Sequence, residues 1–192
     1  MATQFHFEHT FRAPSTEAVF AAYFDPAQLL HQDQMLDIVE RTVLERIEDG
    51  ATLRRTCKVI PRRQLPAIVR PFVDGPLHYV ETATWRKADR EIDIQIWPSL
   101  LRKKPRPPKG GPAGAASSGG PRPTVTALYR LSQRPDGAIR RSYQGTVSVD
   151  LALLSSRIER GIVAEFERSM PIAAVCTQAF LDGTGCYVTG PA

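Results

Sequence analysis

The segment Ser155–Leu181 constrains the fold of this chain more than any other. Apolar residues recur along it at spacings of three and four, which is typical of an amphipathic helix with one buried stripe. Such a helix spans about 40 Å and needs a broad partner surface. Strand-like segments upstream can supply that surface, and a curved sheet that grips one long helix usually encloses a cavity. The stripe consists of Ile158, Ile162, Phe166, Met170 and Ala173.

Three signals describe this helix further. Ser156 and Glu159 have the spacing of a capping box at its start, and Asp182-Gly183 is a plausible stop. Pro171 lies inside the pattern, where it removes the hydrogen bond to the carbonyl of Glu167. We therefore expect Pro171 to kink or interrupt the helix.

Seven upstream segments have the alternation or composition of β-strands, and Asp-Gly pairs at 49–50 and 136–137 predict hairpin turns between them. Ser15 and Asp25-Pro26 begin two short helices after the first strand, and Arg62–Asp74 is predicted as a loop or one short helix across the sheet. We expect an α+β fold, with a curved antiparallel seven-stranded sheet around the long C-terminal helix. The strands are Gln4–Arg12, Leu36–Ile47, Thr52–Val59, Leu77–Trp85, Glu91–Trp97, Thr124–Leu131 and Ile139–Val149.

Composition places the chain among globular proteins. Its 192 residues suit one domain, and 42% hydrophobic and 23% charged residues are ordinary values. The sequence has no apolar run of membrane-spanning length and no signal-peptide pattern, so we expect a cytoplasmic protein. Cys57, Cys176 and Cys186 lack the spacing of a metal site or a redox pair and are expected to be free thiols.

The excess of positive charge comes from one region of the sequence. The net charge is +5, but the segment 99–123 holds six basic residues and no acid, so the rest of the chain has a net charge of −1. This segment is rich in Pro and Gly and is predicted to be flexible. It is either a solvated insertion or a basic tether that holds the protein at an anionic membrane. Membrane contact would use Leu100, Leu101, Arg102, Lys103, Lys104 and Arg106.

A nucleic-acid partner is not expected, because no aromatic residue alternates with these basic residues. The sequence also lacks the motifs of metalloproteases, serine hydrolases and phosphate- or dinucleotide-binding loops. We therefore predict no catalytic residue, no metal ligand and no cofactor. One alternative stays open, an acid–base pair assembled from Glu81 with His9 or His78, although His78 and Glu81 should face opposite ways on one strand.

The period of two along the strands predicts which residues face the helix. Ile92, Ile94 and Ile96 share one face, and Tyr129 and Tyr143 lie on the apolar faces of later strands. Tyr79 and Trp85 share a phase with Glu81, so the inward face of that strand is left open. The predicted ligand-binding residues are Tyr79, Trp85, Ile94, Ile96, Tyr129, Tyr143, Val147, Ile162, Phe166 and Met170.

Together these elements resemble the helix-grip fold of the START-like, or SRPBCC, superfamily, which includes polyketide cyclases and Bet v 1-like proteins. The supporting segments are FHFEHTFRAPSTEAVFAAYFDP, VLERIEDGATLRRTCKV, GPLHYVETATW and YQGTVSVD…SSRIERGIVAEF. More narrowly, they resemble an uncharacterised bacterial group of that superfamily. The resemblance implies a hydrophobic cavity that binds or transports lipids, sterols, polyketides or other apolar molecules. The insertion 99–123 departs from the pattern expected of the superfamily.

Two hypotheses for function follow. The first is binding or transport of a lipid- or sterol-like molecule in a cavity between the sheet and the C-terminal helix. The second is a cyclase or dehydratase acting on an apolar, polyketide-like substrate, which needs an acid, base or tyrosine in that cavity. Binding is favoured because no catalytic constellation is evident. We expect one START-like ligand-binding domain over 1–183, with 99–123 as an insertion and 184–192 as a tail.

Overall fold

The computed structural model describes residues 2–62, 77–99, 124–149 and 155–184. Its order is one strand, two short helices, six strands and one long helix, so the predicted α+β helix-grip fold is confirmed. Most ends lie within two residues of the predicted ones. The elements are β1 (Thr3–Phe11), α1 (Thr16–Phe24), α2 (Pro26–Met35), β2 (Ile38–Glu48), β3 (Thr52–Pro61), β4 (Tyr79–Arg86), β5 (Glu91–Pro98), β6 (Val125–Gln133), β7 (Ile139–Val147) and α3 (Ser155–Leu181).

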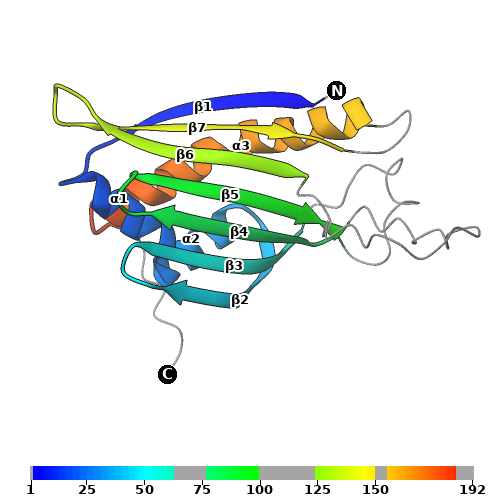
Figure 1. Ribbon diagram of the computed structural model, residues 1–192, viewed down its shortest axis with the longest axis horizontal. Coiled ribbons are helices and arrows are strands. Elements are labelled where there is room, and N and C mark those ends of the chain that lie inside the picture. Colours follow the sequence, from blue (N-terminus) through cyan, green and yellow to red (C-terminus); the bar gives the residue numbers. More distant parts are fainter. Residues whose placement is uncertain (1, 63–76, 100–123, 150–154, 185–192) are drawn as a thin grey trace, which may run out of the picture.

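The strands form one open antiparallel sheet in the order β1-β7-β6-β5-β4-β3-β2. β1 and β2 are the two edge strands. β1 pairs with β7, the strand that is furthest from it in sequence. All three helices lie on one face of this sheet, and α3 crosses behind the strands (Figure 1). The face toward the helices is called the inner face below.

Side-chain caps fix the two short helices. Ser15 Oγ accepts a hydrogen bond from the Ala18 amide at 3.2 Å, as expected of an N-cap. Asp25 ends α1 and caps α2, because its Oδ1 accepts from the amides of Ala27 and Gln28. α2 continues to Met35, and its second half runs along one side of the site.

The two predicted Asp-Gly turns join neighbouring strands. Gly50 follows β2 with a φ of 83°, and Asp49 Oδ1 accepts from the Thr52 amide at 2.7 Å. Gly137 has the same φ of 83° between β6 and β7. Both turns need the left-handed conformation that glycine adopts without strain, which explains why the sequence signal was reliable here.

α3 has the predicted bounds, but the predicted capping box was wrong, and of the two outcomes expected at Pro171 the interruption does not occur. The helix continues through Pro171, so that residue does not interrupt it, and a kink there stays a prediction. Ser156 lies inside the helix and is not its N-cap. Glu159 makes no capping box, because its two carboxylate oxygens accept from the Val149 amide at 2.9 Å and the Thr3 hydroxyl at 2.8 Å. Glu159 thereby fastens α3 to β1 and to the end of β7.

The inner face is densely packed beneath α1. Phe20 is fully buried, and its ring centroid lies 5.1 Å from that of Trp85 and 6.1 Å from that of Tyr129. On the α3 side, Gly145 of β7 makes room for Phe5 of β1, whose ring packs on Phe166, because a Cβ at position 145 would come within 2.7 Å of Phe5 Cζ. These contacts place one end of the inner face in the hydrophobic core.

Several predictions concern residues outside the described ranges. They are the structure of 63–74, the insertion from Leu100 to Pro123, the tail from Gly185 onward and the thiol of Cys186. The division into domain, insertion and tail also stays a prediction. Cys57 and Cys176 are buried and free. Among the helices of the described ranges, none has both the length and the hydropathy needed to cross a lipid bilayer.

Candidate functional site

A cavity of about 330 Å³ lies between the inner face of the sheet and α3. Its walls come from all three helices and from strands β2 to β7. Pro61, Leu77 and Pro98 line one end of it, where β3 and β5 end and β4 is about to begin. The opposite end meets the aromatic core beneath α1 through Tyr23 and Tyr129.

Eight of the ten predicted ligand-binding residues lie in the cavity wall. The other two, Trp85 and Val147, do not line it. Trp85 stacks on Phe20 and Phe24 beneath α1, and Val147 is fully buried in the core. Whether the eight contact a ligand stays a prediction. They are Tyr79, Ile94, Ile96, Tyr129, Tyr143, Ile162, Phe166 and Met170.

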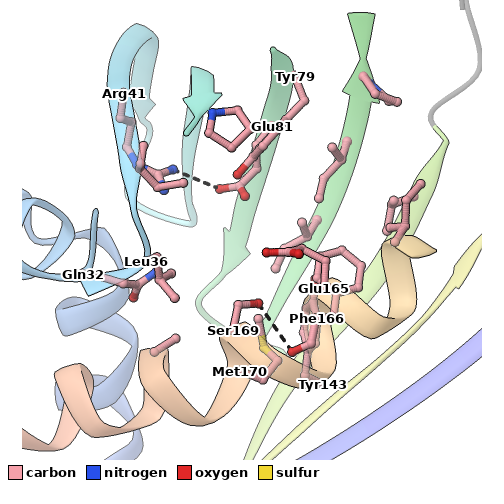
Figure 2. A pocket seen from close by; sticks show the side chains of 18 of the residues that line it. Gln32, Leu36, Arg41, Tyr79, Glu81, Tyr143, Glu165, Phe166, Ser169 and Met170 are labelled. Carbon is pink, nitrogen blue, oxygen red and sulfur yellow. Dashed lines mark hydrogen bonds and ion pairs between the residues drawn. The ribbon is translucent and has the colours of Figure 1, made fainter. Parts of the chain in front are cut away.

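The apolar stripe of α3 faces this cavity along its whole length. Ile158 and Ala173, at its two ends, are buried. Ile162, Phe166 and Met170, between them, are only partly buried although they point toward the sheet. Figure 2 shows Phe166 and Met170 on the side of α3 that faces the strands. The middle of α3 therefore packs on β1 and β7, where the Phe166 ring lies 5.1 Å from that of Phe5 and 6.2 Å from that of Tyr143, and it also borders the hollow.

Sequence analysis did not find the wall formed by α2 and β2. Leu29 and Gln32 on α2, Leu36 at its end, and Ile38 and Arg41 on β2 all line the cavity. β2 carries alternating charges and is exposed along most of its length, so periodicity gave no sign of an inner face. Register shifts between Ile38 and Glu40 and between Val43 and Glu45 disturb its alternation further.

Four charged side chains form a compensated group in this wall, here called the Glu81 cluster: Asp33, Arg41, Arg55 and Glu81. Arg41 donates to Asp33 in a bidentate pair, with Nε–Oδ2 and Nη2–Oδ1 distances of 2.8 Å. Glu81 lies 3.9 Å from Arg41 and 4.0 Å from Arg55 (Figure 2 shows the first contact). Two carboxylates thus face two guanidinium groups, and the cluster is neutral overall.

Glu81 points into the cavity together with Tyr79, which settles the face of β4 that the sequence left open. Burial would by itself lower the pKa of Arg41, but hydrogen bonds to Asp33 and the charge of Glu81 raise it, so this guanidinium stays charged. Burial, and after it the charge of Glu81, raises the pKa of the Tyr79 and Tyr143 hydroxyls. Both hydroxyls keep their protons at neutral pH and can donate hydrogen bonds.

Arg141 on β7 is another buried cation. Its hydrogen-bond partners are not members of the Glu81 cluster. Its Nη2 donates to Nδ1 of His9 and, at 3.5 Å, to the carbonyl of Met170. Its guanidinium also lies 5.3 Å from the ring centroid of Phe11 and 5.6 Å from that of Tyr129. Burial, assisted by the charge of Arg141, lowers the pKa of His9, so His9 is neutral and can accept this bond.

The pair of Glu81 with His9, which the sequence left open, is not assembled, and the pair of Glu81 with His78 stays a prediction. Glu81 faces Arg41 and Arg55, whereas His9 faces Arg141. Within the described ranges, no three His, Cys, Asp or Glu side chains are grouped so that they could hold a metal ion. The charged groups of the wall are thus arginines and acids, with tyrosine hydroxyls between them, and such groups can orient a polar end of an apolar ligand.

Solved structures with similar folds cover nearly the whole chain. The Zhui aromatase/cyclase from Streptomyces sp. R1128 aligns over 100% of both chains with a TM-score of 0.59 and 11% identity. Ara h 8.0201 aligns over 95% of this chain and 99% of its own, with a TM-score of 0.58 and 12% identity. A START superfamily protein from Mycobacterium smegmatis aligns over 94% and 97%, with a TM-score of 0.52 and 10% identity. The fold is therefore START-like, as the sequence resemblance implied.

No curated protein matches the sequence. A family model does match it, over residues 6–181, which run from β1 to the last residue of α3. The match includes every helix and all seven strands, and with them the whole wall of the cavity. The chain accordingly belongs to the family described as proteins of unknown function, DUF2505.

Proposed function

We propose that this protein binds a hydrophobic small molecule, lipid- or sterol-like, in the cavity between the sheet and α3, and carries it. The observation that carries the proposal is the hollow beneath the middle of α3. Ile94 and Ile96 from the sheet and Ile162 and Phe166 from the helix line the same space. Apolar surface left unfilled costs stability, since each buried CH₂ contributes about 0.8 kcal/mol. An apolar ligand would recover that free energy.

The size of the cavity limits the ligand. A volume of about 330 Å³ lies near the lower end of the range of about 300–1,000 Å³ for small-molecule sites. It suits a single chain or a few fused rings better than a lipid with two acyl chains. The tyrosine hydroxyls and the Glu81 cluster supply the few polar groups that orient ligands in such sites.

Native mass spectrometry of the protein purified from the organism that encodes it tests this proposal. We expect a fraction of the protein to carry a bound apolar compound, released when the protein is denatured and extracted with organic solvent. Protein that is free of ligand, and that also takes up no compound from a total lipid extract of the same cells, would contradict the proposal.

A second candidate function is that of a cyclase or dehydratase on an apolar, polyketide-like substrate. The specific observation in its favour is the placement of Glu81 with the protonated hydroxyls of Tyr79 and Tyr143 in the cavity wall. A similar fold occurs in an aromatase/cyclase. The same extraction distinguishes the two: an enzyme yields two compounds that differ by one water or by a ring closure, whereas a carrier releases its ligand unchanged.

Transfer at an anionic membrane is a finer proposal that rests on sequence alone. The six basic residues of the segment 99–123 follow Leu100 and Leu101, and each basic residue near an anionic surface contributes about 1 kcal/mol. Vesicles with and without anionic lipid, mixed with the full chain or with a variant that lacks 100–123, provide the test. Equal sedimentation of both proteins would leave the segment as an insertion. The cytoplasmic location likewise stays a prediction.

A further inference from the structure

Arg141 is a buried cation without a compensating anion in the described part of the chain. Only 3% of the residue is exposed, and its guanidinium lines the cavity. Its described partners are the neutral imidazole of His9, the carbonyl of Met170, the hydroxyl of Tyr129 and the rings of Phe11 and Tyr129. None of these groups carries a negative charge. Its Nε finds no hydrogen-bond partner among the described residues.

The Glu81 cluster shows the surroundings of the other two guanidinium groups that line the cavity from strands, Arg41 and Arg55. Arg41 has Asp33 and Glu81 beside it, and Arg55 has Glu81 at 4.0 Å, so each of these guanidinium groups faces at least one carboxylate. A buried charge without such a partner carries a large desolvation cost. Arg141 is thus the exception in a wall that otherwise balances its charges.

Arg141 also stands at a suitable place to receive a ligand. Its neighbours Tyr129, Tyr143 and Met170 all line the cavity, and Figure 2 shows Tyr143 on the sheet and Met170 on α3. This is the end of the cavity that meets the core beneath α1. The apolar stretch through Ile94, Ile162 and Phe166 leads away from it along the middle of α3.

We propose that the natural ligand is an amphipathic anion, an apolar molecule with a carboxylate that pairs with Arg141 while its apolar part lies beneath α3. This inference rests on the proposed function, because it specifies the ligand of the same cavity. A planar guanidinium binds a carboxylate through two parallel hydrogen bonds. The ligand would supply the missing negative charge.

Two probes of equal length and different head groups test this inference: laurate, which carries the carboxylate, and dodecanol, which does not. Their dissociation constants are measured by displacement of N-phenylnaphthylamine from the full chain, below the micelle concentration of each probe. We expect laurate to bind wild-type protein about tenfold to hundredfold more tightly than dodecanol, the range of a hydrogen bond to a charged group. Dodecylamine should bind more weakly than either.

The variant Arg141→Gln should bring laurate and dodecanol to equal affinity. Arg141→Lys keeps the charge and should retain part of the preference, and it serves if the glutamine variant does not fold. Arg140→Gln is the matched control. Arg140 precedes Arg141 on β7 but points outward, to an ion pair with Glu8. It should leave the preference unchanged.

Equal binding of laurate and dodecanol by wild-type protein would overturn the inference and leave the proposed function intact. A preference for laurate that survives in Arg141→Gln would overturn it too, because another group would then hold the carboxylate. Failure of all three probes to bind would overturn the inference and also count against the proposed function.

Discussion

The inner face of the sheet is filled beneath α1 and hollow beneath the middle of α3. Under α1, Phe20 and Trp85 stack and leave almost no exposed surface. Under α3, Ile162 and Phe166 border a cavity of about 330 Å³, and the Phe166 ring contacts the sheet only on its other side, through Phe5 and Tyr143. Both regions are apolar, so hydrophobicity alone does not distinguish them. The difference shows that one end of the fold supplies stability and the other is kept open at the expense of stability, as is common for binding sites.

Truncating one aromatic side chain in each region tests the difference in packing with the largest expected effect. Phe20→Ala should lower the free energy of unfolding by about 3–5 kcal/mol, because it leaves a void in packed core. Phe166→Ala should cost only about 1–2 kcal/mol, because that ring already borders open space. Urea unfolding of both variants measures the two losses. Equal losses would mean that the two regions do not differ in packing.

Adding one methyl group at each of two glycines should change the stability in opposite directions. Gly145→Ala should destabilise the protein by about 1–3 kcal/mol, since its Cβ would lie 2.4 Å from the Thr126 carbonyl oxygen and 2.7 Å from Phe5 Cζ. Gly161→Ala on α3 meets no atom within 4 Å and should stabilise the helix by about 0.5–1 kcal/mol. Thermal unfolding of the pair is the measurement, and two shifts of the same direction would contradict it.

A smaller effect concerns His9, which joins the cavity wall to β1 through Arg141. Its pKa is lowered in the folded protein, by burial and then by the charge of Arg141, so the unfolded chain binds a proton more readily. Stability should therefore fall as the pH drops below the unfolded value of about 6.5. Urea unfolding between about pH 5 and about pH 8 should show this loss.

The variant His9→Gln provides the control for that titration, because it cannot take up a proton. Its stability should change less with pH over the same interval than that of wild-type protein. The carboxyl groups whose pKa is lowered, such as Glu8 and Glu91, titrate at more acidic pH and do not disturb the comparison. Identical pH profiles of stability for the two proteins would show that His9 does not cause the loss of stability at low pH.

Sequence periodicity predicted the fold well because sheet and helix periods are local properties. The stripe of α3 and the inward phase of Ile94 and Tyr129 follow from spacing alone. Periodicity reveals the face of a residue but not what covers that face. Trp85 has the same phase as the cavity residues of β4, yet Phe20 and Phe24 cover it.

The charged part of the wall was harder to predict. Arg41 reaches the cavity from an edge strand with disturbed alternation, and it meets Asp33 and Glu81 only when α2, β2 and β4 come together. The position of Arg141 in the cavity wall depends on the pairing of β7 with both β1 and β6. These contacts join residues far apart in the chain, and no spacing in the sequence encodes them.

The central claim is that the hollow beneath α3 takes up an apolar ligand, and filling it is the most direct test. Ser169 lines the cavity from α3, so Ser169→Trp should occupy the space and abolish binding of the neutral fluorescent probe N-phenylnaphthylamine. Val175 lies on the same helix but is 67% exposed, and Val175→Trp should bind the probe as wild-type protein does. Equal probe binding by the two folded tryptophan variants would contradict the account.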